Sequence, residues 1–123
     1  MRGLDRALLA LAGLAGLLGV ALSAAAAHRD GGETLRTAAS FLLFHAPLVV
    51  ALVALSASGI TNGLATRVSA LAILIGLTLF SGDLTARAFL GAPLFPYAAP
   101  SGGFALMAGW LVMAVAAFLP RRG

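Results

Sequence analysis

The chain contains neither cysteine nor lysine, and only 10% of its 123 residues are charged. The absence of cysteine excludes disulfides, thiolate metal sites and a cysteine nucleophile. A soluble domain carries about 25% charged residues, so the low charge is typical of a membrane protein. All eight basic residues are arginines spread along the chain. Because a nucleic-acid-binding protein presents a basic patch or stripe, this spread excludes that class.

Four long apolar stretches make up most of the sequence. Each is close to the ~20 residues that a helix needs to cross ~30 Å of hydrocarbon; they cover residues 7–27, 37–57, 65–90 and 102–119. The connectors are short, and short connectors place neighbouring helices antiparallel. We therefore expect an all-α, polytopic membrane protein, with four antiparallel transmembrane helices in an up-down bundle and a single domain over residues 1–123.

The first apolar segment has a second interpretation as a secretory signal peptide. Arg2 and Arg6 fit a basic leader, residues 8–22 its apolar core, and the small residues 23–27 a cleavage region. The apolar run extends to Ala27, however, which is long enough to span the membrane. We therefore expect a retained helix.

The arginines also predict the orientation, because cytoplasmic loops are enriched in basic residues. In a four-span chain, one side carries Arg2, Arg6, Arg67, Arg121 and Arg122, and the other carries Arg29, Arg36 and Arg87. Five against three predicts that both termini are cytoplasmic.

Asp83 is a carboxylate inside an otherwise apolar stretch. A charge at the bilayer centre costs about 2.5–3.5 kcal/mol on insertion scales, so it is rarely accidental. Arg87 follows at i+4, with the acid first, which is the better orientation for a helical ion pair. We expect a structural ion pair near the outer end of the third helix. The alternative is that the pair forms the floor of a polar pocket open to the outer leaflet, with a rim made by His28, Asp30, Glu33 and Arg36.

Histidines raise the question of a metal or a haem. His28 lies where the first helix leaves the membrane. If the second helix starts near Thr34, His45 is about 11 residues into it and lies ~16 Å deeper at 1.5 Å per residue. A zinc ion needs its nitrogen ligands at ~2.0–2.1 Å, so the two imidazoles cannot share one metal. We expect no metal and no cofactor in this chain alone, although a haem shared with another chain through His45 stays open. A proton relay from Asp83 to His45 fits the residue types but has no pathway, and the preferred interpretation is an intramembrane polar contact by His45 and Ser40.

Small residues recur at four-residue spacing, which allows two helix backbones to approach closely. The candidates are Ala15, Gly19, Ser23 and Ala27 on the first helix, and Ala105 and Gly109 on the fourth. With 15 glycines in the chain, simple abundance is the alternative explanation.

Several stretches in order carry a resemblance to a known family. They are residues 21–28, which end at His28; residues 37–40, followed by His45; residues 79–84 (Leu-Phe-Ser-Gly-Asp-Leu); residues 99–103; and Gly109-Trp110. Together they resemble the small four-helix membrane proteins called domain of unknown function 423, similar to transmembrane protein 256, over nearly the whole chain. One departure is the alanine run before His28, where family members usually have Gly-Ala-Phe-Gly. The resemblance implies a four-span inner-membrane protein and no established activity.

No Ser-His-Asp arrangement, phosphate loop or pair of carboxylates is present, so we expect no enzyme. We expect a small integral protein of the bacterial inner membrane, a non-catalytic accessory or structural subunit that contacts a larger membrane complex through its helices. Its partners would be membrane lipids and other membrane protein chains. The alternative is a lipid or small-molecule binding or transport protein that uses the outer polar pocket.

Overall fold

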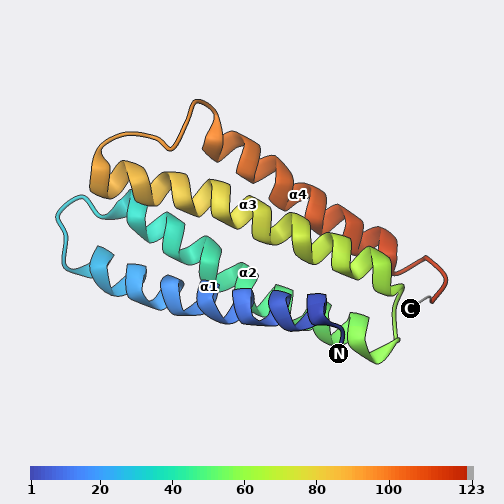
Figure 1. Ribbon diagram of the computed structural model, residues 1–123. Helices are drawn as coiled ribbons and strands as arrows, with labels where there is room; N and C mark the ends of the chain where they lie inside the picture. Colours follow the sequence, from blue (N-terminus) through green and yellow to red (C-terminus); the bar gives the residue numbers. More distant parts are fainter. Residues whose placement is uncertain (122–123) are drawn as a thin grey trace.

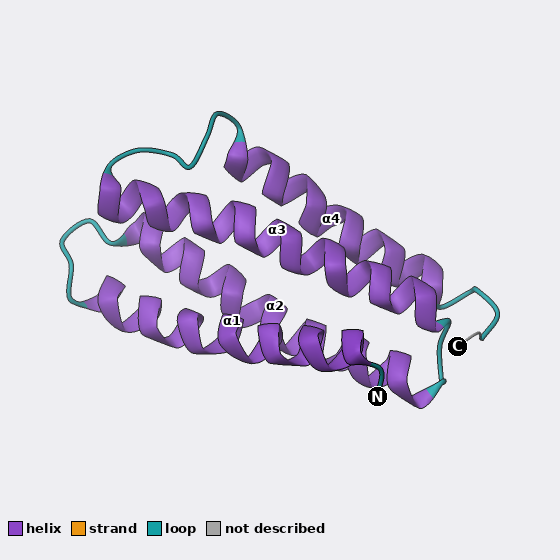
Figure 2. Cartoon of the chain, viewed as in Figure 1, coloured by secondary structure: helices purple, strands orange, loops and turns teal. Residues whose placement is uncertain are grey.

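The computed structural model describes residues 1–121, and it is all-α. Its helices are α1 (Gly3–Ala27), α2 (Glu33–Ser58), α3 (Gly63–Leu90) and α4 (Ala98–Ala116). All four are long and apolar enough to cross a membrane, judged by length and composition. Successive helices run in opposite directions, and both chain ends lie at the same end of the molecule (Figure 1). Only loops and turns join the helices (Figure 2).

All four helices begin earlier than the apolar pattern indicates, α3 by two residues and the other three by about one turn. α1 begins at Gly3 instead of residue 7, α2 at Glu33 instead of residue 37, and α4 at Ala98 instead of residue 102. The added first turns are polar or contain proline. Acidic side chains such as Glu33 are favourable near a helix N-terminus, and a proline such as Pro100 is tolerated in the first turn. α4 also ends earlier, at Ala116 instead of residue 119.

Glycine and asparagine define the connector boundaries. α2 and α3 are followed directly by Gly59 and Gly91, whose φ angles of 74° and 72° lie in the left-handed region that favours glycine. The Asn62 side chain caps α3 by accepting a hydrogen bond from the backbone N–H of Ala65 at 3.0 Å. These local signals limit the connector between α2 and α3 to residues 59–62.

The helices contact one another in sequential order, and the arrangement is open. α2 packs against both α1 and α3, α4 packs against α3, and α1 touches α3 only lightly. Within residues 1–121, the α1 and α4 backbones do not come into contact. The core therefore lies along α2 and α3, where residues such as Val49, Leu52 and Ile73 are completely buried. α1 and α4 are the outer helices, and most of their surface is exposed and apolar.

Candidate functional site

Asp83 fastens the connector between α3 and α4 to the end of α3. Its Oδ2 accepts a hydrogen bond from the Nε of Arg87 at 2.9 Å, and its Oδ1 accepts one from the backbone N–H of Leu94 at 2.8 Å. The Asp83 side chain is fully buried, whereas the Arg87 side chain is 47% exposed. Both carboxylate oxygens are therefore used within the chain. Sequence spacing indicated the Arg87 contact, but the Leu94 contact depends on how the connector folds back.

The end of the molecule opposite the chain termini contains a polar pocket with a volume of about 290 Å³, called the outer-end pocket below. Arg87 lines it but Asp83 does not; the other lining residues are Arg29, Gly31, Gly32, Thr34, Leu35 and Ala88. This pocket differs from the expected one. Glu33 and Arg36 instead line a separate hollow with Thr37, Ser40 and Phe41, and His28 and Asp30 are exposed.

Arg29, in the connector between α1 and α2, contacts α3, and sequence reasoning missed this contact. Its Nη2 donates to the carbonyl of Ala88 at 2.9 Å. Its guanidinium carbon also lies 4.7 Å from the centre of the Phe89 ring, a cation–π distance. The available signal was that Arg29 follows the end of α1 and Phe89 lies at the end of α3, and these two helix ends lie at the same end of an up-down bundle.

His45 lies between α2 and α4, and both of its ring nitrogens are hydrogen-bonded. Trp110 donates its indole N–H to His45 Nε2 at 3.1 Å. An indole can only donate, so Nε2 accepts and Nδ1 carries the proton. Nδ1 then donates to the carbonyl of Phe41 at 2.7 Å. In this arrangement His45 has no lone pair left for a metal, and its partner is Trp110 and not Ser40.

A buried ion pair at the opposite end of the molecule was not foreseen. Arg67 Nε lies 2.9 Å from Asp5 Oδ1, and Arg67 Nη2 lies 3.1 Å from Asp5 Oδ2, a two-point contact between α1 and α3. Both side chains are almost completely buried. Next to it, the hydroxyls of Ser56 and Thr66 lie 2.5 Å apart and join α2 to α3. Sequence reasoning counted Arg67 only as a topology signal and overlooked Asp5.

The small residues proposed for packing fall in different environments. On α1, Ala15 and Gly19 are buried against α2, and a Cβ on Gly19 would lie 2.8 Å from Leu43; Ser23 is half-buried and Ala27 is exposed. On α4, Ala105 is half-buried, whereas Gly109 is buried against Ile73. Ser69 donates its hydroxyl to the Gly109 carbonyl at 2.6 Å.

A close approach between α3 and α4 involves glycines that the spacing argument did not select. A Cβ on Gly102 would lie 2.5 Å from the backbone nitrogen of Phe80 and 2.8 Å from the carbonyl oxygen of Gly76. α3 and α4 therefore meet backbone to backbone near Gly76 and Gly102.

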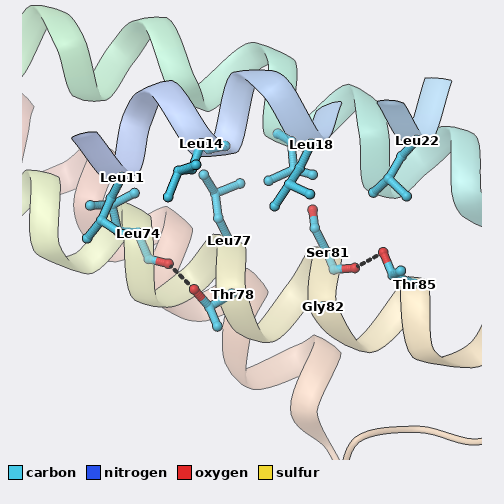
Figure 3. Close-up of a pocket in the computed structure, with 12 residues that line it drawn as sticks. Leu11, Leu14, Leu18, Leu22, Leu74, Leu77, Thr78, Ser81, Gly82 and Thr85 are labelled. Atoms are coloured by element: carbon cyan, nitrogen blue, oxygen red, sulfur yellow. Dashed lines mark hydrogen bonds between the residues drawn. The ribbon is translucent and has the colours of Figure 1, made fainter. Parts of the chain in front are cut away.

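An apolar groove of about 390 Å³ runs between α1 and α3. Figure 3 shows leucines of α1 facing α3 across it. α1 and α2 contribute Leu11, Leu14, Ala15, Leu18, Leu22 and Leu42, and α3 contributes Leu74, Leu77, Thr78, Ser81, Gly82 and Thr85. The hydroxyls of Thr78 and Thr85 donate to carbonyls of their own helix (Figure 3). The hydroxyl of Ser81 donates to the carbonyl of Ala38 at 2.9 Å. The groove therefore presents a nearly apolar surface.

Metal ligands do not cluster in the part of the chain that the structure covers. Among residues 1–121, no three His, Asp or Glu side chains lie close enough together to hold a metal ion. The side chains of Asp5, His45 and Asp83 are instead bonded in small, separate contacts within the chain.

Comparisons with known proteins agree with this architecture. A family model described as "Protein of unknown function (DUF423)" matches residues 19–103. A UPF0382 membrane protein of Haemophilus influenzae is 32% identical over 117 residues, which cover 89% of this chain and 92% of that protein. No solved structure matches the chain. The chain is therefore a small multi-span membrane protein, similar to a bacterial membrane protein, and it belongs to the DUF423 family.

Proposed function

We propose that this protein is a non-catalytic accessory or structural subunit that binds a larger membrane complex through its outer helices. The observation that supports this best is that its buried carboxylates and buried imidazole are occupied by hydrogen bonds within the chain. The carboxylates of Asp5 and Asp83 and the imidazole of His45 all form their hydrogen bonds within the chain. No buried acid or base is left free among these three to act on a substrate.

The outer helices supply the surface for such contacts. On α4, Phe104 and Leu111 are 70% and 66% exposed, and Phe118, just beyond the helix, is 90% exposed. α4 packs on α3 along one side, so its opposite face is available to another transmembrane helix. Association of helices within a membrane depends on close van der Waals packing and interhelical hydrogen bonds, which an apolar helix face can supply without reactive groups.

Site-specific photo-crosslinking in cells tests this proposal. A photo-crosslinkable residue at Leu111, which is 66% exposed, should give one discrete adduct. The same residue at Leu106, which is 3% exposed, serves as the control and should give none. Purification in a mild detergent should then recover the adduct's partner with the tagged chain. Recovery of a lone monomer, with no discrete adduct at Leu111, would reject the proposal.

The proposed location is the bacterial inner membrane, with both termini in the cytoplasm. The arginine bias supports this orientation. Arg67 and Arg87 each form an ion pair, one on each side of the molecule. Setting aside these two leaves four arginines on the side of the termini against two on the other side.

A second candidate function is the binding or transport of a lipid or another small molecule. The α1–α3 groove and the outer-end pocket favour it, because ligand sites are concave and largely apolar with a few polar groups. Detection of a lipid retained by the purified protein tests this candidate separately from any protein partner.

A further inference from the structure

The apolar groove and the outer-end pocket lie end to end along α1 and α3. On α3 the groove ends at Thr85, and the pocket begins at Arg87. On α1 the groove ends at Leu22, and the chain then leads to Arg29, whose Nη2 lies 2.9 Å from the Ala88 carbonyl. Ala88 and Thr85 are neighbours on the helix surface at i,i+3 spacing. The Arg29 guanidinium is therefore about one helical turn beyond the outer end of the groove.

The length of the groove matches one leaflet of a membrane. Its α3 residues run from Leu74 to Thr85, which is about 16 Å along the helix axis at 1.5 Å per residue. A bilayer's hydrocarbon core is about 30 Å thick, so one leaflet supplies about half of that. Apart from Leu74, these residues lie in the C-terminal half of α3, on the side of the outer-end pocket.

The lining of the groove suits a hydrocarbon chain. Leucines dominate it, and the hydroxyls of Thr78, Ser81 and Thr85 are satisfied by backbone carbonyls. A polar small molecule would find no unpaired group there to replace its hydrogen bonds with water.

The outer-end pocket has the opposite chemistry. Arg29 and Arg87 both line it, and no acidic side chain does. Arg87 uses its Nε for Asp83, and within residues 1–121 its terminal nitrogens donate no hydrogen bond. Guanidinium groups bind phosphate oxygens with charge-assisted hydrogen bonds. Without a carboxylate in the lining, the pocket offers no anionic side chain to pair with a headgroup amine.

We propose that the groove and the pocket together form a binding site for one phospholipid with an anionic headgroup. One acyl chain lies in the α1–α3 groove, and the phosphate lies between Arg29 and Arg87. The inference rests on the second proposed function, and it specifies the ligand class and the residues that select it.

Native mass spectrometry of the purified chain with an equimolar mixture of phosphatidylglycerol and phosphatidylethanolamine tests the headgroup. The wild-type chain should retain phosphatidylglycerol preferentially. Arg29→Gln should lower that preference about fivefold, since one basic residue near a membrane surface contributes roughly that factor toward an anionic lipid. Arg36→Gln is the matched control, because Arg36 lies at the same end but lines a different hollow.

Arg29→Lys distinguishes the effect of losing the positive charge from the effect of losing structural contacts. Arg29 also holds the Ala88 carbonyl and the Phe89 ring, so Arg29→Gln can weaken the outer end of the structure. Arg29→Lys changes the same contacts but keeps the charge, and it should retain more of the preference than Arg29→Gln. Equal loss in both variants would assign the effect to the fold and overturn the phosphate contact.

A second pair of variants tests the groove. Thr78→Trp places a bulky side chain in the groove and should lower retention of both lipids, whereas Leu71→Trp, at an exposed position of α3 outside the groove, should not. Groove-dependent retention without headgroup preference would overturn the phosphate site and leave lipid binding as a function. No retained lipid, or equal effects of Thr78→Trp and Leu71→Trp, would overturn both. Crosslinking at Leu111 tests the accessory role independently.

Discussion

At the residue scale, buried ionisable groups hold the helices together at both ends of the molecule. Asp5 and Arg67 join α1 to α3 at one end, and Asp83 secures the α3–α4 connector at the other. Removal of one partner from a buried ion pair leaves the other charge uncompensated. These contacts therefore matter most for stability, and they are the natural first targets for mutation.

Asp5→Asn is expected to destabilise the protein by about 3 kcal/mol or more, because it leaves the buried Arg67 charge without its carboxylate. Unfolding by a denaturing detergent in mixed micelles measures the effect. Arg6→Gln is the control, because Arg6 is exposed on the same helix turn. A loss no greater than that of Arg6→Gln would contradict a role of the Asp5–Arg67 pair in stability.

The contact between His45 and Trp110 is a second target at this scale. His45→Leu removes the acceptor of the indole N–H and should cost about 1 kcal/mol, in the range measured for hydrogen bonds between transmembrane helices. Trp110 is the single tryptophan in the chain, so its fluorescence reports the environment of this contact directly. Phe44→Leu, at a 70% exposed position of α2, should leave the emission unchanged. An emission spectrum unaffected by His45→Leu would show that the hydrogen bond is absent.

At the element scale, the α3–α4 pair depends on the absence of side chains where the two backbones meet. Gly102→Ala should destabilise the protein by about 1–3 kcal/mol, the usual range for overpacking, because backbone atoms of Phe80 and Gly76 cannot rotate away from a new Cβ. Gly103→Ala is a matched control at the next residue, where nothing lies within 4 Å of a Cβ. The same detergent unfolding assay compares the two. Equal stabilities would mean that α3 and α4 are farther apart than the structure indicates.

At the scale of the whole molecule, the natural absence of cysteine gives a direct test of orientation. Asp30 and Ile60 are exposed in connectors at opposite ends. In intact cells, a membrane-impermeant maleimide should label Asp30→Cys, and it should label Ile60→Cys only after the membrane is opened. The reverse pattern would place both termini outside the cytoplasm.

The fold was largely predictable because a membrane restricts the choice of structure. Spanning segments must satisfy their backbone hydrogen bonds internally, so long apolar runs read as helices. Where the helices begin was less predictable. The first turns at Glu33 and Ala98 are polar or contain proline, and neither helix has a side-chain hydrogen bond at its N-cap, so the apolar pattern did not mark where they begin.

The candidate site was predictable only where its residues are close in the chain. Asp83 and Arg87 are four residues apart, and helical geometry alone brings them together. Arg67 and Asp5 are 62 residues apart, and Trp110 and His45 are 65 residues apart. No local periodicity encodes such pairs, because they depend on the rotation of each helix about its axis.

By itself, the sequence determined that the chain is a helical membrane protein with an ion pair between Asp83 and Arg87. Apolar length and i,i+4 spacing are local properties, and they hold in any arrangement of the helices. Only the tertiary structure decided that the α1 and α4 backbones stay apart, that Arg67 reaches Asp5, and that Arg29 lies beyond an apolar groove. Those features depend on how the helices pack side by side. Helices of similar composition can pack in different arrangements.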